Sequence, residues 1–365
     1  MNYLSNVNPG IDQIAPYQPG KPVETLEREL GITDSVKLAS NENPLGPSPR
    51  VMRDLPSQLA QLARYPDGGC FHLKEALGKR FEVDPSMITI GNGSNDVLEI
   101  LGRLFLRPGT NAVVSEHSFV VYGLVTLAQG AEVREVPARD FGQDLNATLS
   151  VIDDNTRLVF IANPNNPTGT WVKSAELERF LDAVPSDVLV VLDEAYFEYV
   201  SDPDYPDGLA LMGRYSNLIV TRTFSKAYGL AGLRLGWSVS PPEVADLMNR
   251  IRQPFNVNSL AMAGGLIALT DDDHVEAGVA VNNLGLEQMR SGLGSLDLPY
   301  IPSAGNFLTV EFPRGAQPTY EAMLREGVIL RPVGVYGLAD YLRISIGTES
   351  ENDRCLEALH RVVGR

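Results

Sequence analysis

The sequence contains few cysteines and histidines and no long apolar segment, and each shortage excludes a class of protein. With two cysteines, Cys70 and Cys355, it has neither a disulfide framework nor the CxxC spacing of a zinc site. Its four histidines are scattered without metal-ligand spacing, so no metal is predicted. No apolar run approaches the roughly 20 residues of a membrane helix, and the first residues contain no signal-peptide pattern. We therefore expect a soluble protein of the reducing cytoplasm that has no membrane partner.

Basic residues are also scarce. The chain has 30 lysines and arginines against 46 aspartates and glutamates, which gives a net charge of −16. Nucleic acids and anionic membranes select a basic surface, so the overall charge argues against both as partners. Any anionic ligand must therefore be bound by a local arrangement of hydrogen-bond donors.

The distribution of apolar residues divides the chain into three parts. Residues 1–50 are rich in proline, asparagine and glycine, which predicts an N-terminal arm with little regular structure. Residues 51–275 alternate apolar runs with amphipathic stretches, which predicts a large α/β domain on a mainly parallel sheet. Residues 276–365 predict a smaller α+β domain, to which part of the arm also belongs. The clearest predicted strands are 111–115, 157–162, 187–193 and 217–223.

Lysine occurs six times, and one of the six has an unusual setting. The segment TRTFSKAYGLAGLRLGW, residues 221–237, places Lys226 after a predicted strand and among small and apolar residues. A desolvated lysine near other cations has a depressed pKa, which suits an amine nucleophile. The alternative is a lysine at a loop tip whose amine reaches water, and this segment alone does not decide between the two.

Three other segments place polar groups at strand ends or beside glycines. The strand 187–193 ends in DEAY, so Asp193 is expected at the edge where open α/β sheets bind ligands. The segment NPNNPTG follows another strand and predicts a rigid turn that carries Asn166. The segment GNGSND, residues 91–96, predicts a helix start whose N–H groups could bind a phosphate. Taken alone, each segment also fits an ordinary cap or turn.

Together these segments supply an amine, a carboxylate, an amide-bearing turn and an anion site, with Arg234 as a second group for a phosphate. This set matches pyridoxal 5′-phosphate, because a carboxylate can keep its ring nitrogen protonated and the ring able to accept electrons. From LASNENPLGPSP to GVILRPVGVYGLADYLRISIGT, the segments resemble fold-type-I pyridoxal-phosphate-dependent aminotransferases, and most closely the histidinol-phosphate aminotransferase family. The resemblance covers nearly the whole chain.

The resemblance implies three catalytic residues and a set of cofactor contacts. Lys226 would bind the cofactor covalently and then move the substrate's Cα proton, while Asp193 would pair with the ring nitrogen. Tyr196 and Asn166 would hydrogen-bond the ring oxygen, and Phe119 would stack on the ring. The contacts near the phosphate would come from Gly93, Ser94, Asn95, Thr223, Ser225 and Arg234.

The resemblance also implies a homodimer and a substrate site. Tyr65 would reach the phosphate held by the partner subunit. Arg331 and Arg343 would bind the anionic end of the substrate, and Tyr17 and Asn41 would lie on the substrate side. The small-molecule partners would be an amino donor and a 2-oxo acid.

The implied reaction is transamination of L-histidinol phosphate with 2-oxoglutarate, which gives imidazole-acetol phosphate and glutamate in histidine biosynthesis. An aromatic aminotransferase for phenylalanine or tyrosine is the first alternative, because EHSFVVYG has His117 and Ser118 where many family members have Pro-Thr. A pyridoxal-phosphate-dependent phosphoamino-acid decarboxylase is the second, since the motifs do not exclude it. A transcription regulator fits poorly, because the chain is acidic and its first 50 residues are rich in proline.

Overall fold

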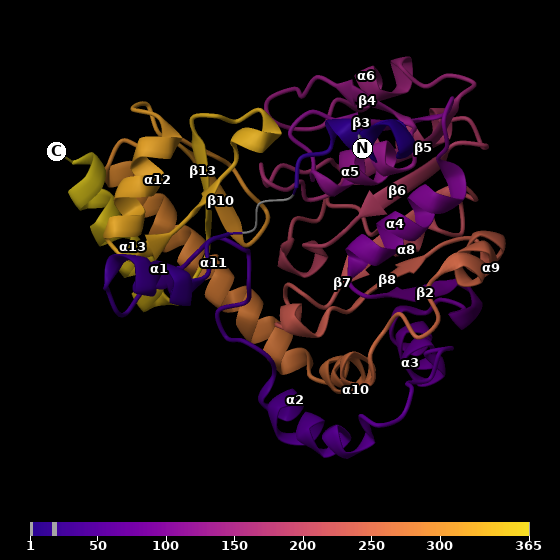
Figure 1. The fold of residues 1–365 in the computed structure, drawn as a ribbon, viewed down its shortest axis with the longest axis horizontal. Coiled ribbons are helices and arrows are strands. Elements are labelled where there is room, and N and C mark those ends of the chain that lie inside the picture. The colour runs from indigo at the N-terminus through magenta and orange to yellow at the C-terminus, as the bar shows by residue number, and fades with distance from the viewer. Residues whose placement is uncertain (1–2, 17–19, 365) are drawn as a thin grey trace.

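A seven-stranded sheet and a four-stranded sheet, each packed against helices, form the core of the fold (Figure 1). The computed structural model describes residues 3–16 and 20–364. Its α-helices are α1 Val23–Leu30, α2 Pro49–Asp54, α3 Phe71–Phe81, α4 Ser94–Phe105, α5 Val121–Ala128, α6 Leu145–Ser150, α7 Ser174–Ala183, α8 Gly208–Leu211, α9 Pro242–Ile251, α10 Ser259–Ala268, α11 Asp272–Ser295, α12 Ala316–Arg325 and α13 Glu349–Val363. The short 3₁₀ helices are η1 Tyr3–Asn6, η2 Ile11–Gln13, η3 Leu55–Gln61, η4 Pro85–Met87, η5 Phe197–Tyr199, η6 Ala231–Leu233 and η7 Gly334–Tyr336.

The larger sheet has the order β2-β8-β7-β6-β5-β3-β4 and is parallel except for β8, which confirms the predicted mainly parallel sheet. Its strands are β2 Ile88–Gly91, β3 Asn111–Ser115, β4 Glu132–Val136, β5 Thr156–Ala162, β6 Leu189–Asp193, β7 Leu218–Thr223 and β8 Gly236–Val239. Four of these, β3, β5, β6 and β7, correspond to the predicted strands. The reversed β8 was not predicted, because an apolar run does not reveal the direction of its strand.

Side chains of β6 alternate between the two faces of this sheet. Val190 and Leu192 pack with α7, whereas Val191 packs in the cluster that contains α4 and α5. Because successive residues of a strand point to opposite faces, Asp193 falls on the same face as Val191. The sheet therefore presents this carboxylate at the side on which α4 begins.

The smaller sheet is antiparallel and has the order β12-β13-β10-β9. Its strands are β9 Tyr300–Ile301, β10 Phe307–Glu311, β12 Arg331–Pro332 and β13 Tyr341–Ser345. Helices α11, α12 and α13 contribute to the core on this sheet. The long α11 runs from beside α10 to the smaller sheet (Figure 1). The predicted boundary at residues 275–276 falls inside α11, and the division of the chain into domains stays a prediction.

The N-terminal part is more regular than predicted. Helix α1 lies beside the C-terminal elements (Figure 1), and the two-residue strand β1 Val36–Lys37 pairs in parallel with β11 Val328–Ile329. The prediction of little regular structure in residues 1–50 is wrong here, because VETLEREL places apolar residues at helical spacing. One of them, Leu26, is buried against Ala39 and Ile329.

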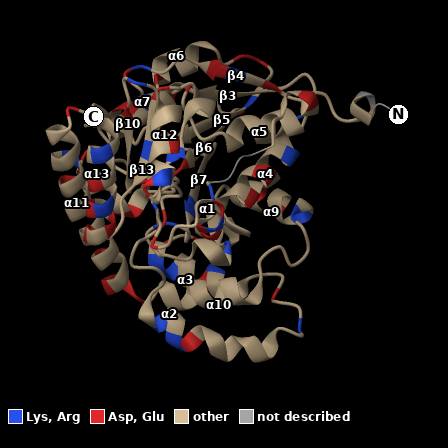
Figure 2. Cartoon of the chain, turned by 60° about the vertical axis from the view of Figure 1, so that its left-hand side comes forward, with Lys and Arg blue, Asp and Glu red and all other residues tan. Residues whose placement is uncertain are grey.

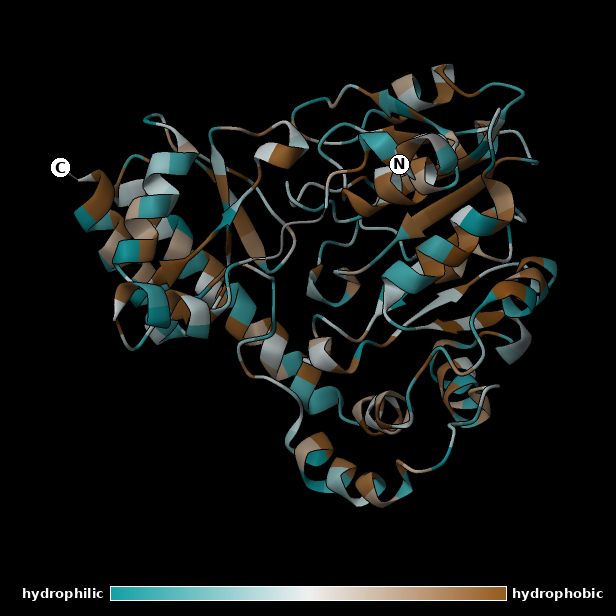
Figure 3. Cartoon of the chain, viewed as in Figure 1, coloured by the Kyte–Doolittle hydropathy of each residue, from teal (hydrophilic) through white to brown (hydrophobic). Residues whose placement is uncertain are grey.

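The charged residues lie mostly on helices and loops at the outside of the molecule (Figure 2), whereas the strands of both sheets are largely apolar (Figure 3). Across residues 3–16 and 20–364, no helix combines the length and the apolar composition that crossing a membrane demands. In the same residues, no group of histidine, cysteine, aspartate and glutamate side chains is arranged to hold a metal ion.

Candidate active site

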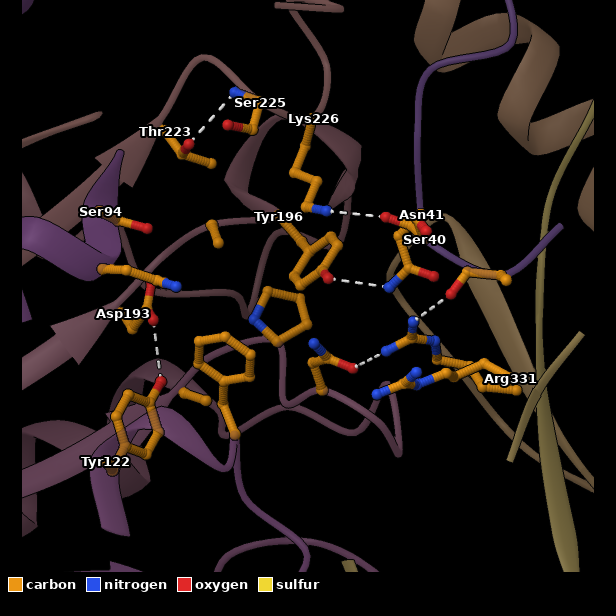
Figure 4. A pocket seen from close by; sticks show the side chains of 18 of the residues that line it. Ser40, Asn41, Ser94, Tyr122, Asp193, Tyr196, Thr223, Ser225, Lys226 and Arg331 are labelled. Atoms are coloured by element: carbon orange, nitrogen blue, oxygen red, sulfur yellow. Dashed lines mark hydrogen bonds between the residues drawn. The ribbon is translucent and has the colours of Figure 1, made fainter. Parts of the chain in front are cut away.

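A cavity of about 210 Å³ lies where the carboxyl ends of β5, β6 and β7 face the smaller sheet. Most of the predicted site residues line this cavity, and Figure 4 shows several of them pointing into it. The predicted residues in its lining are Asn41, Ser94, Asn95, Phe119, Asn166, Asp193, Tyr196, Thr223, Ser225, Lys226, Arg234, Arg331 and Arg343. Segments that are distant in the sequence therefore meet at one place.

Lys226 follows β7 and extends its amine into the cavity (Figure 4). Its Nζ donates a hydrogen bond to the carbonyl oxygen of Ser40 over 3.1 Å. Burial, together with the positive charges of Arg343 and Arg234, lowers the pKa of this amine from 10.5 to about 7. A large fraction of the Lys226 amines is therefore neutral and nucleophilic at physiological pH. Because the amine lies in the cavity, the alternative of a loop-tip lysine that reaches water is excluded.

Asp193 ends β6 and is held by two hydroxyl groups. Tyr122 donates to its Oδ2 over 2.9 Å, and Thr221 donates to its Oδ1 over 3.0 Å. Burial raises the pKa of the carboxyl group, and these two hydrogen bonds oppose that shift. Sequence reasoning missed both partners. Tyr122 is in the first turn of α5, three residues after Phe119, and Thr221 is the register partner of Asp193 on β7.

Tyr196 and Asn166 line the part of the cavity next to Asn41 and Arg343. The hydroxyl oxygen of Tyr196 accepts a hydrogen bond from Asn41 Nδ2 over 2.9 Å (Figure 4). Burial raises the pKa of Tyr196 to about 12, so its hydroxyl keeps its proton at neutral pH. Asn166 accepts a hydrogen bond from the guanidinium of Arg343, which links the turn after β5 to strand β13.

Glycine at two positions lets strand β8 and the side chain of Arg234 approach the beginning of α4 closely. A Cβ atom on Gly236 would lie 2.2 Å from the backbone nitrogen of Ser94, and one on Gly93 would lie 2.4 Å from Arg234 Nη2. Gly93 also has a φ of 84°, which favours glycine. Arg234 further donates to the hydroxyl of Ser225 over 3.3 Å.

These groups fit a phosphate ester. The N–H groups at the start of a helix and its dipole favour an anion, and a guanidinium adds charge-assisted hydrogen bonds. The hydroxyls of Ser94, Thr223 and Ser225 border the same part of the cavity. This donor set is the one expected for the phosphate of pyridoxal 5′-phosphate.

We expect Gly236→Ala to disturb this phosphate site, because its methyl group would press on the backbone of α4 rather than on a movable side chain. Overpacking of this kind costs about 1–3 kcal/mol, so the Kd for pyridoxal 5′-phosphate should rise about 5- to 150-fold. A fluorescence or absorbance titration measures this affinity. Gly232→Ala is the matched control in the same segment, since its Cβ would meet no atom within 4 Å. Equal affinity of the two variants would contradict the expectation.

Two arginines form the opposite side of the cavity. Arg331 on β12 and Arg343 on β13 are directly opposite each other in an antiparallel pair, and both side chains are buried. The guanidinium of Arg343 donates to the carbonyl oxygen of Ala39 over 2.8 Å. Like charges placed directly opposite are destabilising, so the pair is suited to an anion that both can bind.

Three predicted residues have other positions. Tyr65 is 84% exposed, stacks on Phe255 with ring centroids 4.7 Å apart and does not line the cavity. Gly93 caps α4 and contributes through the close approach described above. Tyr17 lies outside the residues that the structure describes.

Comparisons with known proteins agree with this geometry. The model of the family "Aminotransferase class I and II" matches residues 33–359. Histidinol-phosphate aminotransferase 2 of Pseudomonas fluorescens is 54% identical, with 100% of this chain and 99% of that protein covered. The protein of the same name from Pseudomonas aeruginosa is also 54% identical, with 99% of each chain covered. The crystal structure of histidinol-phosphate aminotransferase from Sinorhizobium meliloti in complex with pyridoxal-5′-phosphate is 30% identical, with a TM-score of 0.91 over 99% of this chain and 98% of that one.

Proposed function

The chain belongs to the class I and II aminotransferase family, and from this premise we propose that it transfers the amino group of L-histidinol phosphate to 2-oxoglutarate, with pyridoxal 5′-phosphate as cofactor. The products are imidazole-acetol phosphate and glutamate. The predicted resemblance to fold-type-I aminotransferases is confirmed.

The pair of opposed arginines is the observation that carries the choice of substrate. A phosphate monoester bears about −1.5 to −2 charges at pH 7, and Arg331 and Arg343 together offer two guanidinium groups. The carboxylate of an aromatic amino acid bears one charge and would leave the second arginine without a substrate anion. The pair faces the amine of Lys226 across the same cavity.

When bound, the cofactor supplies a ring that accepts the electrons released at the substrate's Cα atom. Lys226, as a neutral amine, acts first as nucleophile and then as the base that removes and returns the Cα proton. Asp193, held by Tyr122 and Thr221, would keep a proton on the ring nitrogen of the bound cofactor. Tyr196 would donate its hydroxyl proton to the ring oxygen. The two arginines orient the anionic end of the donor.

A homodimer is part of this proposal. The segment from residue 52 to residue 71 exposes an unusual number of large apolar side chains, which an interface between two copies would cover. They are Met52, Leu59, Leu62, Tyr65 and Phe71. Tyr65 would thereby be placed near the partner's phosphate site, and the molar mass in solution tests this arrangement. A cytoplasmic location, proposed from the cysteine usage, agrees with two thiols that are both free and buried.

The substrate assignment is tested by comparing kcat/KM for histidinol phosphate, histidinol, phenylalanine, tyrosine and histidine. Histidinol lacks only the phosphate, and each charge-assisted hydrogen bond contributes about 1.5–3 kcal/mol, so we expect its kcat/KM to be about 10²- to 10⁴-fold lower. A higher value for phenylalanine or tyrosine would replace the proposal with an aromatic aminotransferase. Release of CO₂ without transfer of the amino group would indicate a decarboxylase.

The reactivity of Lys226 should depend on pH with a midpoint near neutrality. We expect covalent binding of pyridoxal 5′-phosphate by the cofactor-free protein to accelerate as pH rises through about 7, because deprotonation of Lys226 produces the nucleophile. Stopped-flow absorbance measures the rate. The carboxylate of Glu42 raises this pKa, so Glu42→Gln should move the midpoint to lower pH. A midpoint above 9 in the wild-type protein would contradict the expected shift from the ordinary value of 10.5.

A further inference from the structure

Residues 39–41, which follow β1 and which we call the strap, bind three side chains through three successive carbonyl groups. Ala39 accepts from Arg343 over 2.8 Å, Ser40 accepts from Lys226 over 3.1 Å, and Asn41 accepts from Asn306 over 3.0 Å. The strap therefore contacts the proposed nucleophile and a proposed substrate-binding arginine at the same time. Figure 4 shows Ser40 and Asn41 beside Lys226 and Tyr196.

Asn41 is fixed in the strap by several hydrogen bonds. It is 1% exposed and has a φ of 54°, in the left-handed region that asparagine tolerates better than most residues. Its backbone N–H donates to Ser345 Oγ over 2.8 Å, and Ser345 Oγ donates to Asn41 Oδ1 over 3.0 Å. The amide nitrogen is left for Tyr196, to which it donates over 2.9 Å.

The direction of this last hydrogen bond has a chemical consequence for Tyr196. An amide nitrogen only donates, so the hydroxyl oxygen of Tyr196 is the acceptor and its proton is free for another partner. The hydroxyl borders the cavity. We propose that Asn41 is a positioning residue that holds Tyr196 as a hydrogen-bond donor toward the ring oxygen of the bound cofactor. This inference rests on the proposed function and assigns Asn41 a role toward Tyr196 in place of the predicted contact with substrate.

Ionisable groups from several elements surround Tyr196, so charge and hydrogen-bond direction must be separated. Lys226 Nζ lies 5.8 Å from the centre of the ring. Burial raises the pKa of the phenol most, Arg343 and the hydrogen bond from Asn41 lower it, and Asp193 and Tyr336 raise it. Because the phenol remains protonated at neutral pH, the contribution of Asn41 is to direct the proton rather than to remove it.

Two substitutions at position 41 separate this role from a purely structural one. Asn41→Asp keeps the size of the side chain and its acceptor for Ser345, but its carboxylate would accept the proton of Tyr196 and turn it away from the cavity. Asn41→Gly keeps the left-handed backbone without strain and removes both side-chain hydrogen bonds. If Asn41 directs the proton of Tyr196, Asn41→Asp should change the cofactor affinity and the absorbance titration more than Asn41→Gly does. If Asn41 is only structural, Asn41→Gly should cause the larger change.

The measurements are the Kd for pyridoxal 5′-phosphate and the pH at which the visible absorbance of the bound cofactor changes. A hydrogen bond to the ring oxygen neutralises part of its negative charge, so losing the bond should raise that pH. We expect an increase of about one pH unit in Asn41→Asp, an increase of the same sign in Tyr196→Phe, and a smaller one in Asn41→Gly. The Kd should be about tenfold higher in Asn41→Asp than in Asn41→Gly.

A double-mutant cycle excludes a direct effect of the new negative charge. If Asn41 acts through the phenol, Asn41→Asp should cause little further shift when Tyr196 is already phenylalanine. An undiminished shift in the Tyr196→Phe background would overturn the inference, as would a larger effect of Asn41→Gly. The titrations contain no amino donor. A protein that binds the cofactor but does not transfer the amino group of histidinol phosphate would therefore refute the proposed function alone.

Discussion

Lys226→Ala is expected to lower kcat for transamination by at least about 10³-fold and to abolish the visible absorbance of covalently bound cofactor. The variant loses the residue proposed both as the nucleophile that binds the cofactor and as the base that moves the Cα proton. General-base catalysis alone contributes about 10²- to 10⁴-fold. A coupled assay for glutamate formation, together with the absorbance spectrum, measures the change.

The same substitution should leave the cofactor-free protein at least as stable as the wild type. Burial of the amine disfavours its charged form, which lowers its pKa to about 7, and alanine avoids that unfavourable burial. Thermal unfolding of the two cofactor-free proteins tests this point. Lys173→Ala is the matched control, because Lys173 forms an exposed ion pair with Asp204 away from the cavity. Turnover by Lys226→Ala within tenfold of the wild type would refute the assigned mechanism.

Asp193→Asn is expected to lower kcat by about 10²- to 10³-fold while the fold is retained. An amide cannot stabilise a protonated ring nitrogen as a carboxylate does, and loss of a buried charge partner typically costs about 3–5 kcal/mol. The side chain keeps its shape, and its carbonyl oxygen can still accept one of the hydrogen bonds from Tyr122 and Thr221. Steady-state kinetics at saturating cofactor measure the loss.

Thr221→Val provides a graded comparison for this prediction. It removes the hydroxyl that donates to Asp193 Oδ1 and leaves the carboxylate in place. The carboxylate keeps its charge and its hydrogen bond from Tyr122, so the loss of kcat should be smaller than in Asp193→Asn. An Asp193→Asn variant no slower than Thr221→Val would show that the charge of Asp193 is not required.

The residues at the carboxyl ends of the parallel strands could be predicted, because each strand and the polar residues that follow it are recognisable in a short stretch of sequence. Buried parallel strands are continuous apolar runs, and the polar residues that end them must meet at one edge. The motif DEAY does not reveal which of its two carboxylates faces the cavity. In the structure Asp193 lines the cavity. Glu194 lies on the other face of the sheet, where its carboxylate forms a buried ion pair with Arg222 over 2.8 Å.

Contacts between distant segments could not be predicted in the same way. The hydrogen bonds of Asn41 to Tyr196 and Ser345 depend on how the two sheets pack, and no local pattern encodes that packing. Helix α1 was missed because prolines and glycines dominate the composition around eight helical residues. Tyr65 is exposed in the single chain, as its proposed contact with a partner subunit requires.

The strap is translated long before the residues that its carbonyl groups contact. Its hydrogen bonds to Ser345 and Arg343 join residues 304 positions apart. At roughly 5–20 residues per second, a ribosome completes that distance in about 15 to 60 seconds. Arg234, the last of the residues proposed to bind the phosphate, is translated well before Arg331 and Arg343. The residues proposed to hold the cofactor phosphate are thus translated before the two arginines proposed to bind the substrate.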